Sequence, residues 1–166
     1  LNVRWAQLPK GIQADYDVGS LRQPVRVILD THGKVKPDAH LFTLEGEIII
    51  LTASTDVSYP HENVDVICVP KDEHGLDLNV ALRALAAKGI NHLWVEAGAT
   101  LAGSLLNAGL VDELILYQAP TFLGSGTQLV SDLGISTLTE RMDFEIKSVE
   151  KVGPDIKTVM YLKGGN

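Results

Sequence analysis

Cysteine is nearly absent from this sequence. Cys68 is the one cysteine among 166 residues, and it stands in the apolar run VDVICVP. A single thiol excludes a disulfide framework within the chain and a metal site built from several thiolates. We therefore expect Cys68 to be a small buried side chain in a strand. The five histidines show no HExxH or comparable ligand spacing, so the sequence predicts no metal site.

Positive charge and long apolar runs are also scarce. The chain has 14 Lys and Arg residues against 21 Asp and Glu residues, a net charge of −7, and no basic cluster. This balance argues against a surface that binds nucleic acid. No apolar run approaches the roughly 20 residues of a membrane span, and the first residues, LNVRWAQLPK, lack the apolar centre of a signal peptide. We expect a cytoplasmic protein that binds neither nucleic acid nor a membrane.

Aliphatic runs, by contrast, are frequent. Five of them are rich in Ile, Val and Leu: VRVILD (25–30), EIIILTA (47–53), VDVICVP (64–70), HLWVEA (92–97) and ELILYQAP (113–120). Such nearly continuous runs are typical of strands covered on both faces of an α/β sheet. Helices are predicted over residues 78–88, with Asp77 as N-cap and Gly89 as the stop signal, and over residues 99–108. Strand–helix–strand units of this length imply parallel pairing.

The last part of the chain has a different pattern. Residues 144–151 and 156–163 alternate apolar and polar side chains around the turn VGPD, which predicts an antiparallel hairpin. The predicted fold class is therefore α/β. Its sheet is mixed, mainly parallel with a C-terminal antiparallel hairpin, and is flanked by helices within a single domain over residues 1–166.

The segment EAGATLAGS, residues 96–104, has the features of a phosphate-binding turn. Ligands of open α/β sheets bind beyond the carboxyl ends of strands, where the first turn of the next helix offers unpaired N–H groups. Gly98 lets the backbone approach a ligand closely, and Gly103 serves either packing or ligand approach. The segment matches neither a P-loop nor a dinucleotide fingerprint. The alternative is a tight strand–helix turn that binds nothing.

Polar residues at the ends of other predicted strands are further candidates. Glu96 follows an apolar run, so its carboxylate should lie at the sheet rim or be buried, and should accept hydrogen bonds from a ligand or a neighbouring loop. Asp30 and Thr31 either form a second rim pair or simply start the turn at His32. The glycine-rich residues 121–126 either line the same cleft or form a flexible loop.

The block VEAGATLAGSLLNAGLVDELILYQAPTFLG resembles the reductase domain of the bifunctional riboflavin biosynthesis deaminase/reductase of bacteria. The similarity extends through LRQPVRVILDTHGKVKP upstream and the VGPD turn downstream, and so covers essentially the whole chain. The resemblance implies a dihydrofolate-reductase-like fold and a homodimer. It also implies NADPH-dependent reduction of 5-amino-6-(5-phosphoribosylamino)uracil to the ribitylamino compound, by hydride transfer from the nicotinamide to C1′ of the opened ribose.

The resemblance also assigns roles to residues. Leu1, Arg4 and Glu96 would contact the substrate, with Arg4 at the ribose phosphate because a guanidinium binds phosphate in a bidentate manner. The alternative for Arg4 is a solvated terminal charge. Thr31 would lie at the NADPH, together with the segment that starts the second predicted helix: Gly98, Ala99, Thr100, Leu101, Ala102, Gly103 and Ser104. No residue identifies itself as a catalytic acid.

Two departures from the family pattern stand out. Relatives begin this domain about 60 residues earlier, with two strands and a helix whose loss would leave backbone groups unpaired. We therefore expect an N-terminally truncated reductase domain that is poorly active alone. The ligands of the zinc deaminase domain cannot be drawn from one cysteine. The alternatives are a non-catalytic fragment, a ligand-binding or assembly module of the same fold, and a reductase of another pterin-like substrate.

Overall fold

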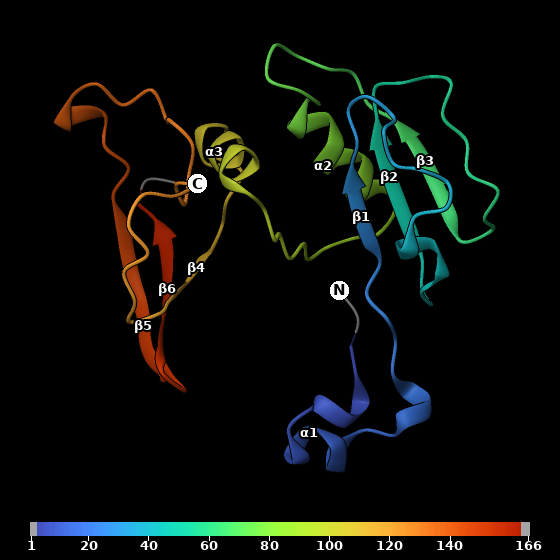
Figure 1. Ribbon diagram of the computed structural model, residues 1–166, viewed down its shortest axis with the longest axis horizontal. Helices are drawn as coiled ribbons and strands as arrows, with labels where there is room; N and C mark the ends of the chain where they lie inside the picture. Colours follow the sequence, from blue (N-terminus) through green and yellow to red (C-terminus); the bar gives the residue numbers. More distant parts are fainter. Residues whose placement is uncertain (1–2, 164–166) are drawn as a thin grey trace. The chain divides into compact units, whose positions relative to one another are not determined.

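The computed structural model describes residues 3–163, apart from the side chain of Ser20, and divides the chain into two compact units, Leu1–Asn91 and His92–Asn166 (Figure 1). We call them the first and the second unit and describe each by itself. The first unit contains η1 (Trp5–Gln7), α1 (Lys10–Asp15), η2 (Val18–Ser20), β1 (Arg26–Leu29), η3 (His40–Thr43), β2 (Ile48–Thr52), β3 (Val64–Cys68) and α2 (Leu78–Ala87). The second contains α3 (Ala99–Asn107), β4 (Leu114–Gln118), η4 (Leu138–Glu140), β5 (Phe144–Val152) and β6 (Asp155–Leu162).

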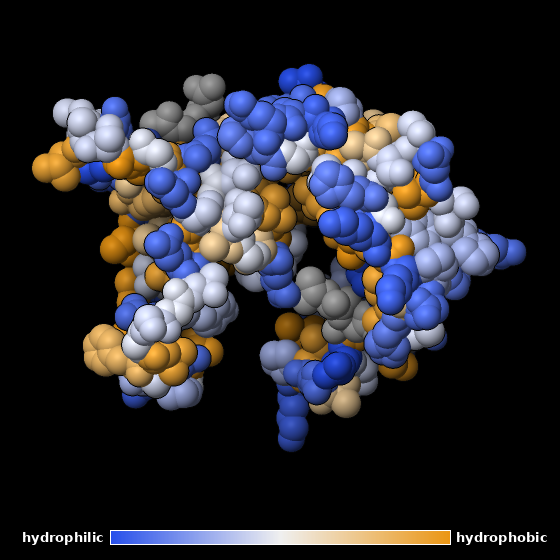
Figure 2. Space-filling model, turned by 45° about the horizontal axis from the view of Figure 1, so that its top comes forward, coloured by the Kyte–Doolittle hydropathy of each residue, from blue (hydrophilic) through white to orange (hydrophobic). Residues whose placement is uncertain are grey.

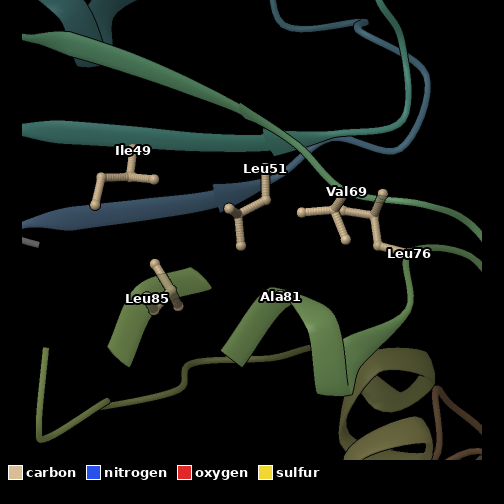
Figure 3. Close-up of a cluster of buried hydrophobic side chains, with 6 residues drawn as sticks. All are labelled: Ile49, Leu51, Val69, Leu76, Ala81 and Leu85. Atoms are coloured by element: carbon tan, nitrogen blue, oxygen red, sulfur yellow. The ribbon is translucent and has the colours of Figure 1, made fainter. Parts of the chain in front are cut away.

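The first unit is built on a parallel sheet of order β1-β2-β3. All five residues of the central strand β2 are buried, because both of its faces are covered. On one face Ile49 and Leu51 point toward α2 (Figure 3), in a cluster completed by Val69, Leu76, Ala81 and Leu85. On the other face Ile48 and Ile50 pack against Phe42 of η3. The continuous apolar run over residues 47–53 thus predicted a doubly covered strand correctly.

Helix α2 has the boundaries that its local signals predict. The Asp77 carboxylate accepts a hydrogen bond from the backbone N–H of Val80 at 3.0 Å, which is the expected N-cap contact. At the other end Gly89 adopts a left-handed φ of +81°, and the N–H of Ile90 reaches back to the carbonyl of Leu85. This is the geometry that favours glycine after a helix.

The second unit carries an antiparallel sheet of order β4-β6-β5. Strands β5 and β6 form the predicted hairpin, closed by a two-residue turn in which Gly153 has a φ of +60°. Glycine with positive φ at the first position of such a turn matches the twist of the strands. Much of this sheet is exposed, and hydrophobic side chains such as Ile146, Val149 and Ile156 are largely accessible to solvent. Figure 2 shows hydrophobic residues at the molecular surface among polar ones.

The α/β class, the parallel sheet and the C-terminal hairpin are confirmed, but three expectations are wrong. The run over residues 113–120 forms β4, which pairs antiparallel with β6 and is not a strand of the parallel sheet. Residues 92–97 form no strand. Among the described residues their backbone pairs with no other strand, and a strand needs such a partner for its N–H and C=O groups. Cys68 does end a strand, but it is exposed because β3 is an edge strand with one open side.

Candidate functional site

The N-terminus of α3 is an open group of hydrogen-bond donors. Gly98, the N-cap residue, offers no side chain, and within the described chain the N–H groups of Ala99, Thr100 and Leu101 have no hydrogen-bond partner. A Cβ added to Gly98 would meet nothing within 4 Å. Free N–H groups and the positive end of the helix dipole favour an anion at such a position. The geometry therefore fits a phosphate group, as the sequence indicates.

The second half of the EAGATLAGS segment has a packing role. The carbonyl of Ala99 accepts a hydrogen bond from the N–H of Ser131 at 3.0 Å, so the loop around Ser131 lies against α3. A Cβ on Gly103 would lie 2.2 Å from the Ser131 hydroxyl oxygen. The Ser104 hydroxyl donates to the carbonyl of Thr100 at 3.1 Å. Of the two explanations for Gly103, the structure supports close packing.

Glu96 lies two residues before the start of α3 and is exposed. The expected position of its carboxylate, at the rim of a sheet or buried there, is wrong because the segment before it has no strand partner among the described residues. The carboxylate instead accepts one long hydrogen bond, from the indole nitrogen of Trp94 at 3.4 Å. An exposed carboxylate next to an open helix start remains available to a polar ligand.

Asp30 acts as a turn-forming residue at the end of β1. Its buried carboxylate accepts hydrogen bonds from the backbone N–H groups of Lys34 and Val35, at 2.8 and 2.7 Å. Gly33 completes the turn with a φ of +66°, where a Cβ would lie 2.3 Å from the side chain of Val57. Of the two alternatives for Asp30, the structure supports the start of a turn.

The charge of Asp30 has an effect on a neighbouring phenol. Tyr59 donates its hydroxyl hydrogen to the carbonyl of Val35 at 3.1 Å. Burial raises the pKa of Tyr59 above its ordinary value, and the negative charge of Asp30 raises it further. The carboxylate thus belongs to the packed interior of the first unit.

Thr31 lies at the carboxyl end of the parallel sheet, half-buried. Its carbonyl accepts a hydrogen bond from Ala53 at the end of β2. Its hydroxyl oxygen lies 3.7 Å from the position of a Cβ on Gly75, which has a φ of +141° in the small hairpin over residues 71–76. The sequence did not indicate this approach of Gly75 to Thr31, because the two residues belong to different loops.

The other predicted site residues are less constrained. Arg4 is exposed at the N-cap of η1, while Leu1 lies outside the described residues. Residues 121–126 are exposed, with Phe122 fully accessible and Gly124 at a φ of +78°. Arg4 and Thr31 belong to the first unit, whereas Glu96 and residues 98–104 belong to the second.

Metal sites and membrane spans were sought in the described residues. No group of three or more His, Cys, Asp or Glu side chains gathers there in a way that could hold a metal ion. In the same part of the chain, every helix is too short or too polar to cross a membrane.

The parallel sheet with its covering helix and the open start of α3 define an α/β protein with an uncapped helix terminus. The sequence model of the RibD C-terminal domain matches residues 1–158, and the chain belongs to this family. The riboflavin biosynthesis protein RibD of Escherichia coli (strain K12) is 40% identical over 157 residues. A 5-amino-6-(5-phosphoribosylamino)uracil reductase of Buchnera aphidicola is 32% identical over 170 residues.

Coverage differs between these relatives. The match to the E. coli protein covers 94% of this chain but 43% of the relative, so the chain spans less than half of that protein's length. The match to the Buchnera reductase covers 98% of this chain and 79% of the relative. Among solved structures, RibD of Acinetobacter baumannii superimposes with a TM-score of 0.74 at 25% identity, over 90% of this chain and 40% of that one. The dihydrofolate-reductase-like arrangement expected from the sequence is thereby confirmed.

Proposed function

We propose that this chain forms the reductase portion of a riboflavin biosynthesis enzyme. The reaction is reduction of 5-amino-6-(5-phosphoribosylamino)uracil to the ribitylamino compound, with hydride delivered from NADPH to C1′ of the ribose. In this proposal the two units belong to one reductase domain, which works in the cytoplasm as part of a homodimer.

One observation carries the proposal: the match to the RibD C-terminal domain extends over residues 1–158. The Buchnera relative, of which the chain covers 79%, bears the name of this reductase. The family therefore supplies the substrate class, and the structure supplies residues whose chemistry fits it.

The start of α3 fits the phosphate groups of a dinucleotide. Its uncapped N–H groups and the open space at Gly98 would receive such a phosphate without a side chain in the way. NADPH, when bound, supplies the hydride. Thr31, at the end of β1, would contribute a hydroxyl group to the cofactor. The role of the chain is then mainly to hold the hydride donor, NADPH, and the hydride acceptor, the substrate, in place.

The substrate would be held by charged residues. Glu96 would accept hydrogen bonds from polar groups of the substrate, and Arg4 would bind the ribose phosphate. Both side chains are exposed, and among the described residues no other charged group engages either of them. Leu1 is assigned to the substrate on the resemblance alone.

A second candidate is a binding or assembly module without catalysis. The observation that favours it is that segment 92–97, which contains Glu96, pairs with no strand among the described residues. If that segment is not held in place, Glu96 has no fixed position relative to a substrate. Catalysis would then be lost while the phosphate-binding helix start remained.

The first experiment is a titration of the chain with NADPH, followed by tryptophan fluorescence, with NADH as the control ligand. The chain has only two tryptophans, Trp5 and Trp94, and Trp94 touches Glu96. Gly98→Asp places a negative charge on the open helix start. Gly11→Asp is its matched control, since Gly11 also has nothing within 4 Å of an added Cβ.

Saturable quenching by NADPH but not by NADH, lost in Gly98→Asp and kept in Gly11→Asp, would support the proposal. NADPH consumption in the presence of the aminouracil substrate would then establish the reaction. Binding without turnover would favour the module, and no binding of either nucleotide would contradict the reductase assignment for this chain.

A further inference from the structure

The N-terminal loop, which we define as residues 3–23, is closed at its base by a side chain. The backbone N–H of Val3 donates to the Gln23 side-chain oxygen at 2.9 Å, and the Gln23 amide donates back to the carbonyl of Val3 at 3.0 Å. Gln13 ties the interior together by donating to the carbonyls of Trp5 and Leu8, at 3.1 and 2.6 Å. A compact surface loop whose ends meet is frequently a functional element.

Residues of this loop line a solvent-open pocket of about 300 Å³, which we call the cavity. That volume is at the lower end of the range for small-molecule sites. The apolar and aromatic part of its wall consists of Val3, Trp5, Leu8, Ile12, Tyr16 and Leu21. Tyr16 is 64% exposed, although a side chain of that size usually gains from burial in such a pocket. A flat ring entering the cavity would cover this exposed surface.

Two charged residues complete the wall, Asp17 and Arg22. Within residues 3–163 no hydrogen bond or ion pair engages the Arg22 guanidinium, whereas Asp17 already has an interaction of its own. A guanidinium next to apolar rings is suited to a planar acidic group. Because Asp17 repels negative charge, a singly charged carboxylate matches the cavity better than a doubly charged phosphate.

We propose that the N-terminal loop binds a small aromatic carboxylic acid. The ring packs among Trp5, Tyr16 and Leu8, and the carboxylate lies against Arg22. The cavity wall contains none of the residues assigned to NADPH or to the aminouracil, although Arg4 belongs to the same loop. Binding of the acid is read at Trp5 and does not require reductase activity.

The test uses the whole chain and nuclear magnetic resonance of the two indole N–H groups. Trp5 lines the cavity and Trp94 belongs to the other unit, which makes Trp94 an internal control. The probe is naphthaleneacetate. Naphthaleneacetamide has the same ring without the charge, and acetate has the charge without the ring. Arg22→Gln removes the proposed partner, and Arg83→Gln, on the exposed side of α2, is the matched loss of one positive charge.

We expect naphthaleneacetate to shift the Trp5 signal in a saturable manner while the Trp94 signal stays in place. The amide, and the acid with Arg22→Gln, should bind about tenfold more weakly, as expected for loss of one charge-assisted contact. Arg83→Gln should bind like the unaltered chain.

Three results would overturn the proposal. One is a Trp5 signal that does not respond to the acid, which would make the cavity an apolar gap that stays empty. Another is equal affinity for the acid and the amide. The third is equal displacement of both indole signals, which would indicate non-specific adsorption.

Discussion

Strands β2 and β5 both carry isoleucine, yet these side chains have opposite environments. Every residue of β2 is buried, whereas β5 lies at the edge of its sheet and leaves Ile146 61% exposed. Helices α2 and α3 differ at their N-termini: α2 is capped by the side chain of Asp77, and α3 starts at Gly98 without a side-chain cap. The core of the first unit is closed around β2 and α2, whereas the second unit leaves apolar surface and the N–H groups at the start of α3 open. The core around β2 therefore contributes mainly to stability, and the open start of α3 is available for binding.

The largest expected effect comes from one substitution made in both sheets. Ile50→Ala in β2 should lower the free energy of unfolding by about 2–5 kcal/mol, because it leaves a cavity in a fully packed core. Ile146→Ala in β5 should change it by no more than about 0.5 kcal/mol, because the side chain is already largely in water. Urea denaturation of the two variants measures both values. Equal losses would show that β5 is covered in solution.

A second comparison concerns two carboxylates. Asp30→Asn should cost about 1–3 kcal/mol of unfolding free energy, since an amide cannot accept hydrogen bonds from both Lys34 and Val35 with its two polar atoms. Glu96→Gln should leave stability within about 0.5 kcal/mol and NADPH binding nearly unchanged.

For Glu96→Gln the expected loss is in substrate turnover, by about tenfold or more, if Glu96 binds the substrate as proposed. Denaturation and steady-state kinetics on both variants separate the two roles. Full activity of Glu96→Gln would remove Glu96 from the site.

The helix starts give a smaller pair of effects. Asp77→Ala should lower stability by about 1 kcal/mol, because the N–H of Val80 loses its acceptor. Gly98→Asp should raise stability by a few tenths of a kcal/mol, up to about 1, because it adds a cap and a favourable charge to α3. Thermal unfolding checks both signs. A loss of stability in Gly98→Asp would mean that the start of α3 is not open.

The smallest expected effect is a pH dependence near η4. Hydrogen bonds from the backbone N–H and the hydroxyl of Ser136, and from the N–H of Thr137, hold the pKa of Glu140 below its ordinary value of 4.5. A lowered folded-state pKa means that the stabilisation is present above the ordinary value and is lost as the pH falls through the folded-state pKa. An acid titration followed by the carboxyl resonances should show Glu140 taking up its proton at a lower pH than an ordinary glutamate. The pH-dependent loss of stability should be absent in Glu140→Gln and present in Glu150→Gln.

The sequence predicted those elements whose signals are local. Helix α2 follows from Asp77 and Gly89, and β2 follows from a continuous apolar run that suits a strand covered on both faces. The run over residues 92–97 is also mainly apolar, but apolar composition does not supply a pairing partner, and the strand is absent. The predicted burial of Cys68 was wrong for a related reason, because the sequence does not show which strand lies at the edge of the sheet.

The candidate site was predictable to a similar extent. The open helix start at Gly98 was expected from the strand-to-helix pattern, whereas the role of Gly103 depends on Ser131, which approaches from a later loop. The N-terminal loop carried no recognisable signal. Its one α-helix is six residues long with no buried side chain, and its closure depends on Gln23 meeting Val3.

The two-residue turn at Gly153 has a consequence for the order of folding. Apart from Lys147 at a bulge, the residues of β5 find their partners on β6 across a two-residue turn, so this hairpin can form within microseconds. Strands β1 and β2 are parallel, and the chain must run from Leu29 to Ile48 before their first pair can form. We therefore expect the sheet with the most surface in water to be present early in folding, while the best-buried strand of the molecule waits for slower loop closure.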